Sequence, residues 1–402
     1  MTRAPHRPGL LCCLALALTG CGFDPGPGAM KLSLNPASEK ALADAPKERA
    51  ALEVLLERLF GTRAGPRYEL IDAWKEDGTD PKHPDRMLEG GARAEFSPEQ
   101  WSAIVAANRE RLAYEISHAP NADSSAALAD TYPSLAESAE LFRTQCLHCH
   151  GVEGGGDGPT GATISPKPRD FRKGIFKFTA VKDKARPRRE DLEELLERGV
   201  DGTAMPSFLR LSLPEREGLV DYVRLLAIRG EVESLLVAGF QDDEEIDDAA
   251  AAEALEIVWG RWQKAREKVI AFDGVVPPDS PAMRARGREL FLDPKRGNCV
   301  SCHGAEGKGD GALAFKTDAQ GRKTPAYRDD WGFEIMPRDF TSGVFRGGSR
   351  PIDIYRRVYA GINGTPMPGI GETKGPDGEL LLSHEDLWAL VHYVRSLAER
   401  AH

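Results

Sequence analysis

The sequence predicts a mainly α-helical protein built from two tandem copies of one small domain, with long glycine- and proline-rich loops and an N-terminal helical extension. Short motifs recur in the same order in residues 133–230 and 284–402. Each copy ends in a segment with apolar residues at helical spacing, and 41 glycines and 28 prolines interrupt the 402-residue chain. We therefore divide the chain into a leader (1–20), an extension (21–132), the two copies, and a linker (231–283).

The first 20 residues have the pattern of a secretory signal peptide. Arg3 and Arg7 precede an apolar stretch, residues 10–18, that is too short to cross a bilayer comfortably. The stretch ends in Leu-Thr-Gly-Cys at Cys21, which resembles the lipobox of bacterial lipoproteins. The resemblance implies cleavage before Cys21 and acylation of that residue, and a plain signal peptide is the alternative. We expect an exported protein that faces the periplasm, held by lipidated Cys21 at the cell membrane or outer membrane.

The extension over residues 21–132 has no counterpart elsewhere in the chain. Two sets of apolar residues at helical spacing predict two helices: Leu52, Leu55, Leu56 and Leu59, and then Trp101, Ile104, Val105 and Leu112. Residues 119–131 have the composition of a linker. The extension is therefore expected to be helical and to lead into the first copy.

The repeat is defined by aligning Cys146 with Cys299. Matching segments follow in the same order: 149–151 with 302–304, 153–158 with 306–311, 168–171 with 337–340, 199–206 with 361–368, and 219–224 with 390–395. Each copy predicts a helix, a Cys-x-x-Cys-His motif, a long loop, a short helix, a Met-Pro turn and a terminal helix. The second copy has an insertion in its loop. Glycines and prolines predict that 154–168 and 304–337 lack regular structure.

Cys-x-x-Cys-His is the spacing used for covalent attachment of c-type haem. The residues concerned are Cys146, Cys149 and His150 in the first copy, and Cys299, Cys302 and His303 in the second. Two thiols within one helical turn can reach the two vinyl groups of one haem, and the adjacent histidine is then placed to bind the iron. A zinc site would need further cysteines or histidines at ligand spacing, and a cytosolic dithiol conflicts with export. We therefore predict two covalently bound haem c groups.

Met205 and Met367 are the candidates for the sixth iron ligand. Each follows Gly-Thr-x and precedes proline, at matching places in the repeat. A thioether is a soft ligand that favours ferrous iron and so raises the reduction potential. With these methionines, the two copies resemble class I cytochrome c domains, in which a methionine on a late loop closes the haem crevice. The resemblance covers both copies and implies His150 with Met205, and His303 with Met367, as axial pairs.

The resemblance also implies how the helices of each domain pack. The first and last helices should cross through two aromatic pairs, namely Phe142 with Tyr222 and Phe291 with Tyr393. The family commonly has glycine at this crossing; Gly287 fits, whereas Ser138 in the first copy predicts slightly wider packing. A loop proline is expected to supply the carbonyl that orients each proximal histidine. Pro337 is the candidate in the second copy, and Pro159, Pro166 and Pro168 compete in the first.

Histidines could replace the methionines as ligands in a bis-histidine site. His384 and His392 lie in the second copy without a counterpart in the first, and His148 lies inside the attachment motif. We expect these to be surface or structural residues. Methionine as core filler remains the other alternative for Met205 and Met367.

The net charge of −10 is unevenly distributed. The linker, 231–283, has 13 acidic and 4 basic side chains and predicts an exposed acidic turn followed by a helix. One basic run in the first copy comprises Lys182, Lys184, Arg186, Arg188 and Arg189. It could dock an acidic redox partner, although such a run is more often a solvated loop. Nucleic-acid binding is not expected, since it needs a concentrated basic face.

These features predict transfer of single electrons between respiratory-chain partners, by a carrier or by a fixed haem subunit of a larger oxidoreductase complex. The enzyme alternative is a di-haem cytochrome c peroxidase, which needs one iron with an open sixth position. Because both copies retain a Met-Pro turn, we expect an electron carrier and no catalytic residues. Gas or redox sensing is a third possibility, but no signalling domain follows the second copy.

Overall fold

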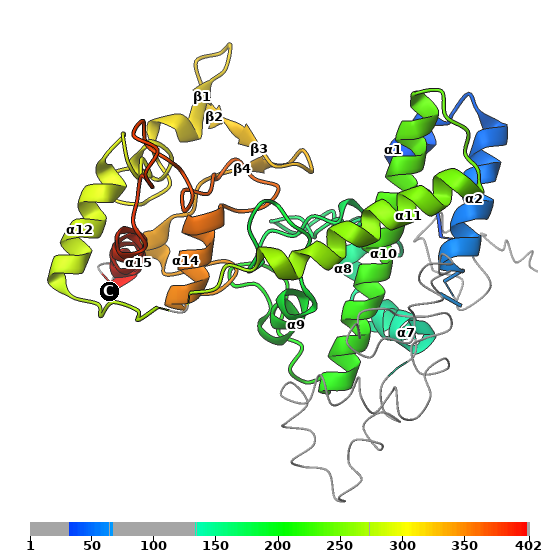
Figure 1. Cartoon of the computed structure of the whole chain (residues 1–402), viewed down its shortest axis with the longest axis horizontal. Helices are drawn as coiled ribbons and strands as arrows, with labels where there is room; N and C mark the ends of the chain where they lie inside the picture. Colours follow the sequence, from blue (N-terminus) through cyan, green and yellow to red (C-terminus); the bar gives the residue numbers. More distant parts are fainter. Residues whose placement is uncertain (1–31, 64, 67–132, 134, 273, 400–402) are drawn as a thin grey trace, which may run out of the picture.

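The computed structural model describes residues 32–63, 65–66, 133, 135–272 and 274–399. Figure 1 shows these residues as two helical bodies next to each other, the first ending after α11 and the second beginning at α12. Helices predominate and the strands are few and short, which confirms the mainly α fold class.

The first body contains the extension, the first copy of the repeat and the linker helix. Its helices are α1 (Pro36–Ala41), α2 (Pro46–Phe60), α7 (Leu135–Gln145), α8 (Leu147–His150), α9 (Arg189–Arg198), α10 (Leu213–Gln241) and α11 (Asp248–Gln263), with 3-10 turns η2 (Phe171–Lys173) and η3 (Lys264–Lys268). The ring centroids of Phe142 on α7 and Tyr222 on α10 lie 5.2 Å apart. The predicted pairing between the first and last helices of this copy is therefore confirmed.

The second body repeats this arrangement with fewer helices. Its elements are α12 (Pro281–Leu292), α13 (Val300–His303), α14 (Pro351–Ala360) and α15 (His384–Glu399), with 3-10 turns η4 (Ala312–Ala314) and η5 (Phe340–Ser342). The rings of Phe291 on α12 and Tyr393 on α15 lie 5.3 Å apart, which confirms the second predicted pair. Trp388 and Tyr355 stack at 4.6 Å and join α14 to the same core.

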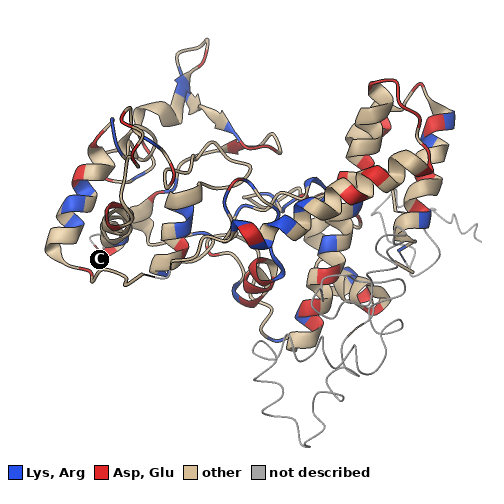
Figure 2. Cartoon of the chain, viewed as in Figure 1, with Lys and Arg blue, Asp and Glu red and all other residues tan. Residues whose placement is uncertain are grey.

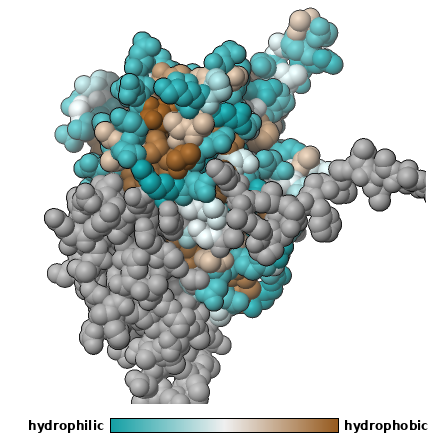
Figure 3. All heavy atoms as spheres, turned by 90° about the vertical axis from the view of Figure 1, so that its right-hand side faces the viewer, coloured by the Kyte–Doolittle hydropathy of each residue, from teal (hydrophilic) through white to brown (hydrophobic). Residues whose placement is uncertain are grey.

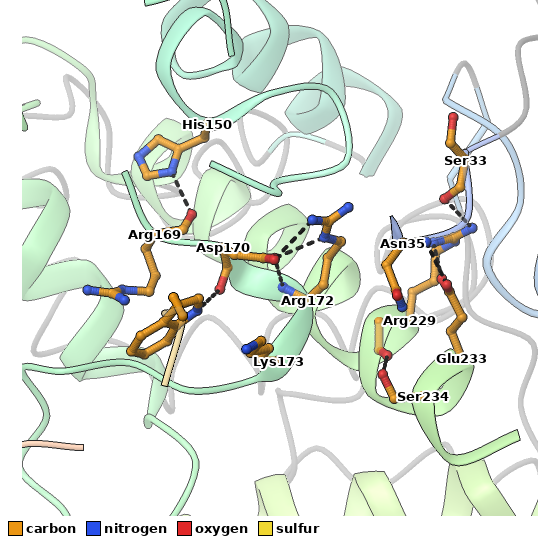
Figure 4. Close-up of polar contacts among 12 residues, drawn as sticks. Ser33, Asn35, His150, Arg169, Asp170, Arg172, Lys173, Arg229, Glu233 and Ser234 are labelled. Atoms are coloured by element: carbon orange, nitrogen blue, oxygen red, sulfur yellow. Dashed lines mark hydrogen bonds and ion pairs between the residues drawn. The ribbon is translucent and has the colours of Figure 1, made fainter. Parts of the chain in front are cut away.

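The extension is tied to the first copy through α10. Arg229, which is buried, donates hydrogen bonds to the carbonyl oxygens of Leu32 and Ser33 at 3.0 and 3.1 Å, and pairs with Glu233 at 3.1 Å (Figure 4). The leucines of α2 that predicted a helix are buried in the same core.

The outer face of α2 exposes an apolar side chain, since Val54 is 61 % exposed. Figure 3 shows a small apolar patch among hydrophilic atoms on this end of the molecule. The second predicted helix, with Trp101, lies outside the described residues.

The linker is not a separate element: its first part, through η3, belongs to the first body, whereas Ile270 near its end is buried in the core of the second. α10 continues to Gln241, beyond residue 230, where the sequence analysis ended the first copy. Residues 241–245 are exposed and form the predicted acidic turn, visible in red between α10 and α11 in Figure 2. α11 follows and buries Trp259 and Trp262 against the core.

The insertion in the second copy contains two short antiparallel β-hairpins. The strands are β1 (Phe315–Thr317) with β2 (Lys323–Pro325), and β3 (Tyr327–Arg328) with β4 (Glu334–Ile335). The prediction that 304–337 lacks regular structure was therefore wrong. Gly321 and Gly332 have φ of +77° and +85° between the paired strands. The glycines that we took as interruptions supply the positive φ that these turns require.

No helix in the described part of the chain has both the length and the apolar character needed to span a bilayer.

Candidate haem sites

Each Cys-x-x-Cys-His motif forms a short helix that ends at its histidine. α8 and α13 follow directly after Cys146 and Cys299. None of the four motif cysteines forms a disulfide bond. Burial raises the pKa of Cys146 and of Cys299 to about 12, so that both stay protonated at neutral pH.

A glycine after each histidine allows the chain to fold back sharply. Gly151 and Gly304 both have φ of +75°, and a Cβ on either would lie 1.9 Å from a carboxylate oxygen, of Asp157 or Asp310 respectively. No side chain fits at either position without displacing the carboxylate. The Cys-His-Gly and Gly-Asp-Gly motifs are therefore parts of one loop, built in the same way in both domains.

Both histidines are oriented by a backbone carbonyl. Nδ1 of His150 lies 3.2 Å from the carbonyl oxygen of Arg169 (Figure 4), and Nδ1 of His303 lies 3.2 Å from that of Arg338. A carbonyl only accepts, so Nδ1 must carry the proton. Nε2 is then the lone-pair nitrogen that could bind a metal.

The residue whose carbonyl accepts this hydrogen bond differs from our expectation. In both domains the acceptor is the arginine that follows Pro168 or Pro337, so the prediction of a proline carbonyl was wrong by one residue. The reason is the path of the loop, which turns the arginine peptide toward the imidazole. No sequence signal marked these carbonyls beyond the repeated Pro-Arg-Asp-Phe.

A phenylalanine ring supports each imidazole on its face. The rings of His150 and Phe171 stack at 4.5 Å, and those of His303 and Phe340 also stack at 4.5 Å. Burial lowers the pKa of His150 to about 4 and also lowers the pKa of His303. Both imidazoles are therefore neutral at pH 7, which is the state that binds iron.

The two Met-Pro turns are held by the same hydrogen bonds. Thr203 donates through Oγ1 to the carbonyl of Val200 at 2.7 Å and accepts from the N–H of Met205 at 3.1 Å. Thr365 makes the equivalent bonds around Met367, at 2.8 and 3.3 Å. Both methionines are partly buried, and Met205 packs against the core that contains Cys146. The Gly-Thr-x-Met-Pro sequence that recurs in the two copies thus forms the same loop geometry in both domains.

The donor set fits covalently bound haem better than a protein-only metal site. In the described ranges, no group of three or more His, Cys, Asp and Glu side chains could hold a metal ion. That finding disfavours structural zinc, which needs four such ligands. Two cysteines outside any disulfide, a neutral histidine with Nε2 available and a methionine loop are the groups that attach and ligate a haem.

The histidines considered as alternative ligands have structural partners. His392 is buried, and its Nε2 lies 2.9 Å from the carbonyl oxygen of Pro277, so that it joins α15 to the end of the linker. His384 shares a hydrogen bond of 2.5 Å with the hydroxyl of Tyr355. These contacts agree with the prediction that both residues are structural.

The basic run of the first copy is largely engaged inside the protein. Its ion pairs are Lys182 with Glu372, Arg186 with Glu231, Arg188 with Asp191, and Arg189 with Glu217 and Asp221. Glu372 belongs to the second domain, and Arg189 is buried. The interpretation as a solvated loop was wrong for Arg186, Arg188 and Arg189, whereas Lys182 makes its ion pair at the surface and Lys184 is exposed.

Comparisons with known proteins agree with the geometry. The family model for cytochrome c matches residues 284–398, and the model for subunit III of cbb3-type cytochrome c oxidase matches residues 133–223. No curated protein matches the chain. Among solved structures, a chain of the reducing HAO-like protein complex of Kuenenia stuttgartiensis is 29% identical, with a TM-score of 0.48, over 65% of this chain and 95% of that chain. This chain contains two tandem cytochrome c domains, a fold that serves haem-based electron transfer.

Proposed function

We propose that this protein is an electron carrier that holds two haem c groups, one in each domain. Cys146 and Cys149 would attach the first, and Cys299 and Cys302 the second. His150 and His303 would be the proximal ligands. The observation that carries the proposal is the matching orientation of these histidines, each with Nδ1 at 3.2 Å from an arginine carbonyl.

The methionines complete the proposed sites. We assign Met205 and Met367 as the sixth ligands because the same threonine contacts shape both loops. A bound haem would supply a one-electron couple, and thioether ligation would raise its potential. The chain's own task is then to hold the ligands, to exclude water and to keep both sixth positions closed.

The location and the partner are also part of the proposal. Cys21 lies outside the described residues, and its lipobox pattern supports an exported protein anchored by acyl chains and facing the periplasm. A tethered carrier of this kind would exchange electrons with redox proteins or with a respiratory complex. The carrier could equally serve as a fixed subunit of such a complex.

Carbon monoxide binding separates the carrier from a peroxidase. If methionine closes both sites, the reduced wild-type protein binds little carbon monoxide and turns over hydrogen peroxide no faster than free haem does. Stoichiometric binding at one site, together with rapid peroxide turnover, would replace the proposal with a di-haem peroxidase. Haem-free protein would reject both.

A further inference from the structure

The two cytochrome c domains contact each other through equivalent parts of the repeat. Gly202 and Gly364 are equivalent glycines of the two Met-Pro turns, residues 199–206 and 361–368, which we call the Met loops. Ile175 and Val344 are equivalent residues after η2 and η5. A Cβ on Gly202 would lie 2.6 Å from Cγ1 of Val344, and a Cβ on Gly364 would lie 3.3 Å from Cγ2 of Ile175. Each Met loop therefore packs against the other domain, in the reciprocal manner of a two-fold interface.

Trp331 departs from this symmetry, because it lies in the insertion that only the second domain has. Its indole Nε1–H donates to the carbonyl oxygen of Asp170 at 3.2 Å. The guanidinium of Arg169 lies over its ring, 3.5 Å from the ring centroid. The indole also contacts Gly364 of its own domain, where an added Cβ would lie 2.4 Å from the ring. One side chain thus touches the first domain's histidine-orienting segment and the second domain's Met loop.

The turn that presents Trp331 is itself held firmly. The carboxylate of Asp329 accepts the backbone N–H of Trp331 at 3.1 Å and that of Phe333 at 3.0 Å. The same carboxylate pairs with Lys177 of the first domain at 2.8 Å, and its side chain is only 4% exposed. The N–H of Asp330 donates to the carbonyl of Gly364 at 3.0 Å. The indole is therefore positioned before any partner binds.

The segment beneath Trp331 orients His150. The carbonyl of Arg169 accepts the Nδ1–H of His150, and the carbonyl of the next residue accepts the indole N–H (Figure 4 shows the segment). The guanidinium of Arg169 carries a positive charge at pH 7, as arginine does in proteins. In the second domain, no aromatic ring stacks on Arg338 among the described residues. The two sites therefore differ in the ring that covers this arginine.

We propose that Trp331 is a positioning residue of the first haem site, which holds Arg169 in place, shields the His150 hydrogen bond from water, and so raises the reduction potential of the first site. The inference rests on the proposed function and deepens it. Ferric haem carries one more positive charge than ferrous haem. A cation kept close by, and water kept out, both favour the ferrous form and raise the potential.

Spectroelectrochemical titration of the purified two-haem protein tests this inference. Trp331→Ala should lower one of the two potentials and leave the other in place, and the affected potential should be the one that Met205→Ala also lowers. Trp331→Phe keeps a ring over Arg169 but loses the indole hydrogen bond, so it should give a smaller shift in the same direction. Phe333→Ala is the control, since Phe333 is 43% exposed in the same hairpin.

A second variant changes the first domain's side of the same contact. Arg169→Gln removes the cation but keeps the backbone carbonyl, and it should lower the same potential even if Trp331→Ala folds poorly. The inference is overturned if the Trp331 and Arg169 variants leave both potentials unchanged, or if they move both equally. It is also overturned if Phe333→Ala gives the same shift as Trp331→Ala. A wild-type protein without covalent haem would instead reject the proposed function itself.

Discussion

Ser138 lies against Gly218 where α7 crosses α10, and a Cβ on Gly218 would be 2.6 Å from the serine hydroxyl. The second domain has the reverse arrangement at the crossing of α12 and α15. There Gly287 is on the first helix, and a Cβ on it would lie 2.0 Å from the carbonyl oxygen of Ala389. Each crossing therefore has one glycine, on the last helix in the first domain and on the first helix in the second. The glycine on α10 makes room for the serine that we expected to widen the packing.

Gly287→Ala should destabilise the second domain. The new methyl group would collide with backbone, which cannot move aside as a side chain can, so we expect a loss of about 1–3 kcal/mol or more. Thermal unfolding followed by circular dichroism measures it. Gly260→Ala on α11 is the matched control, because nothing lies within 4 Å of its added Cβ. The control should be neutral or stabilise by up to about 1 kcal/mol. Equal stability of the two variants would contradict the close crossing.

Asp386 should make the stability of the second domain depend on pH. Burial raises its pKa, but the Ser383 N–H and Arg286 outweigh burial, and the net pKa is lowered. The resulting stabilisation is complete above the unfolded-state pKa of about 4 and is lost as the pH falls through the lowered folded value. Asp386→Asn should cost about 1–2 kcal/mol at pH 7. The difference in unfolding free energy between wild type and variant should narrow as the pH falls below about 4. A difference of constant size there would argue against the ion pair.

Sequence reasoning recovered the parts of this protein that local patterns encode. The repeat, the aromatic pairs and the histidine loops follow from side-chain identity and spacing, and the structure contains each of them. The acceptor for His150 was missed because it is a backbone atom, and side-chain types do not specify where a carbonyl points. Trp331 was missed for another reason, since its contacts cross between domains far apart in sequence. The hairpins of the insertion were missed because their glycines were taken only as interruptions.

Met205→Ala and Met367→Ala should each remove part of the weak long-wavelength band of sulfur bound to ferric iron. Each should also lower one potential and open one site to carbon monoxide, since the soft ligand stabilises the ferrous state. The two effects should be nearly additive because the ligands belong to separate domains. Met336→Ala is a control: Met336 also precedes a proline but is 43% exposed. An unchanged band in both ligand variants would exclude methionine ligation.

Cys21→Ser should release the protein from the membrane or leave its leader uncleaved. Acyl chains on Cys21 would hold the wild-type protein at the membrane surface. Detergent phase partitioning of wild type and variant provides the measurement. Wild-type protein that is exported and stays in the aqueous phase would show that the lipobox pattern is not used.

The haem content of the denatured chain tests the central claim most directly. Thioether bonds survive unfolding, so wild-type protein should retain two haems per chain after acidified organic extraction, measured as the pyridine haemochrome. Cys146→Ala with Cys149→Ala should halve that value, and so should Cys299→Ala with Cys302→Ala. Haem that passes into the organic phase, or a wild-type value of one per chain, would contradict two covalent sites.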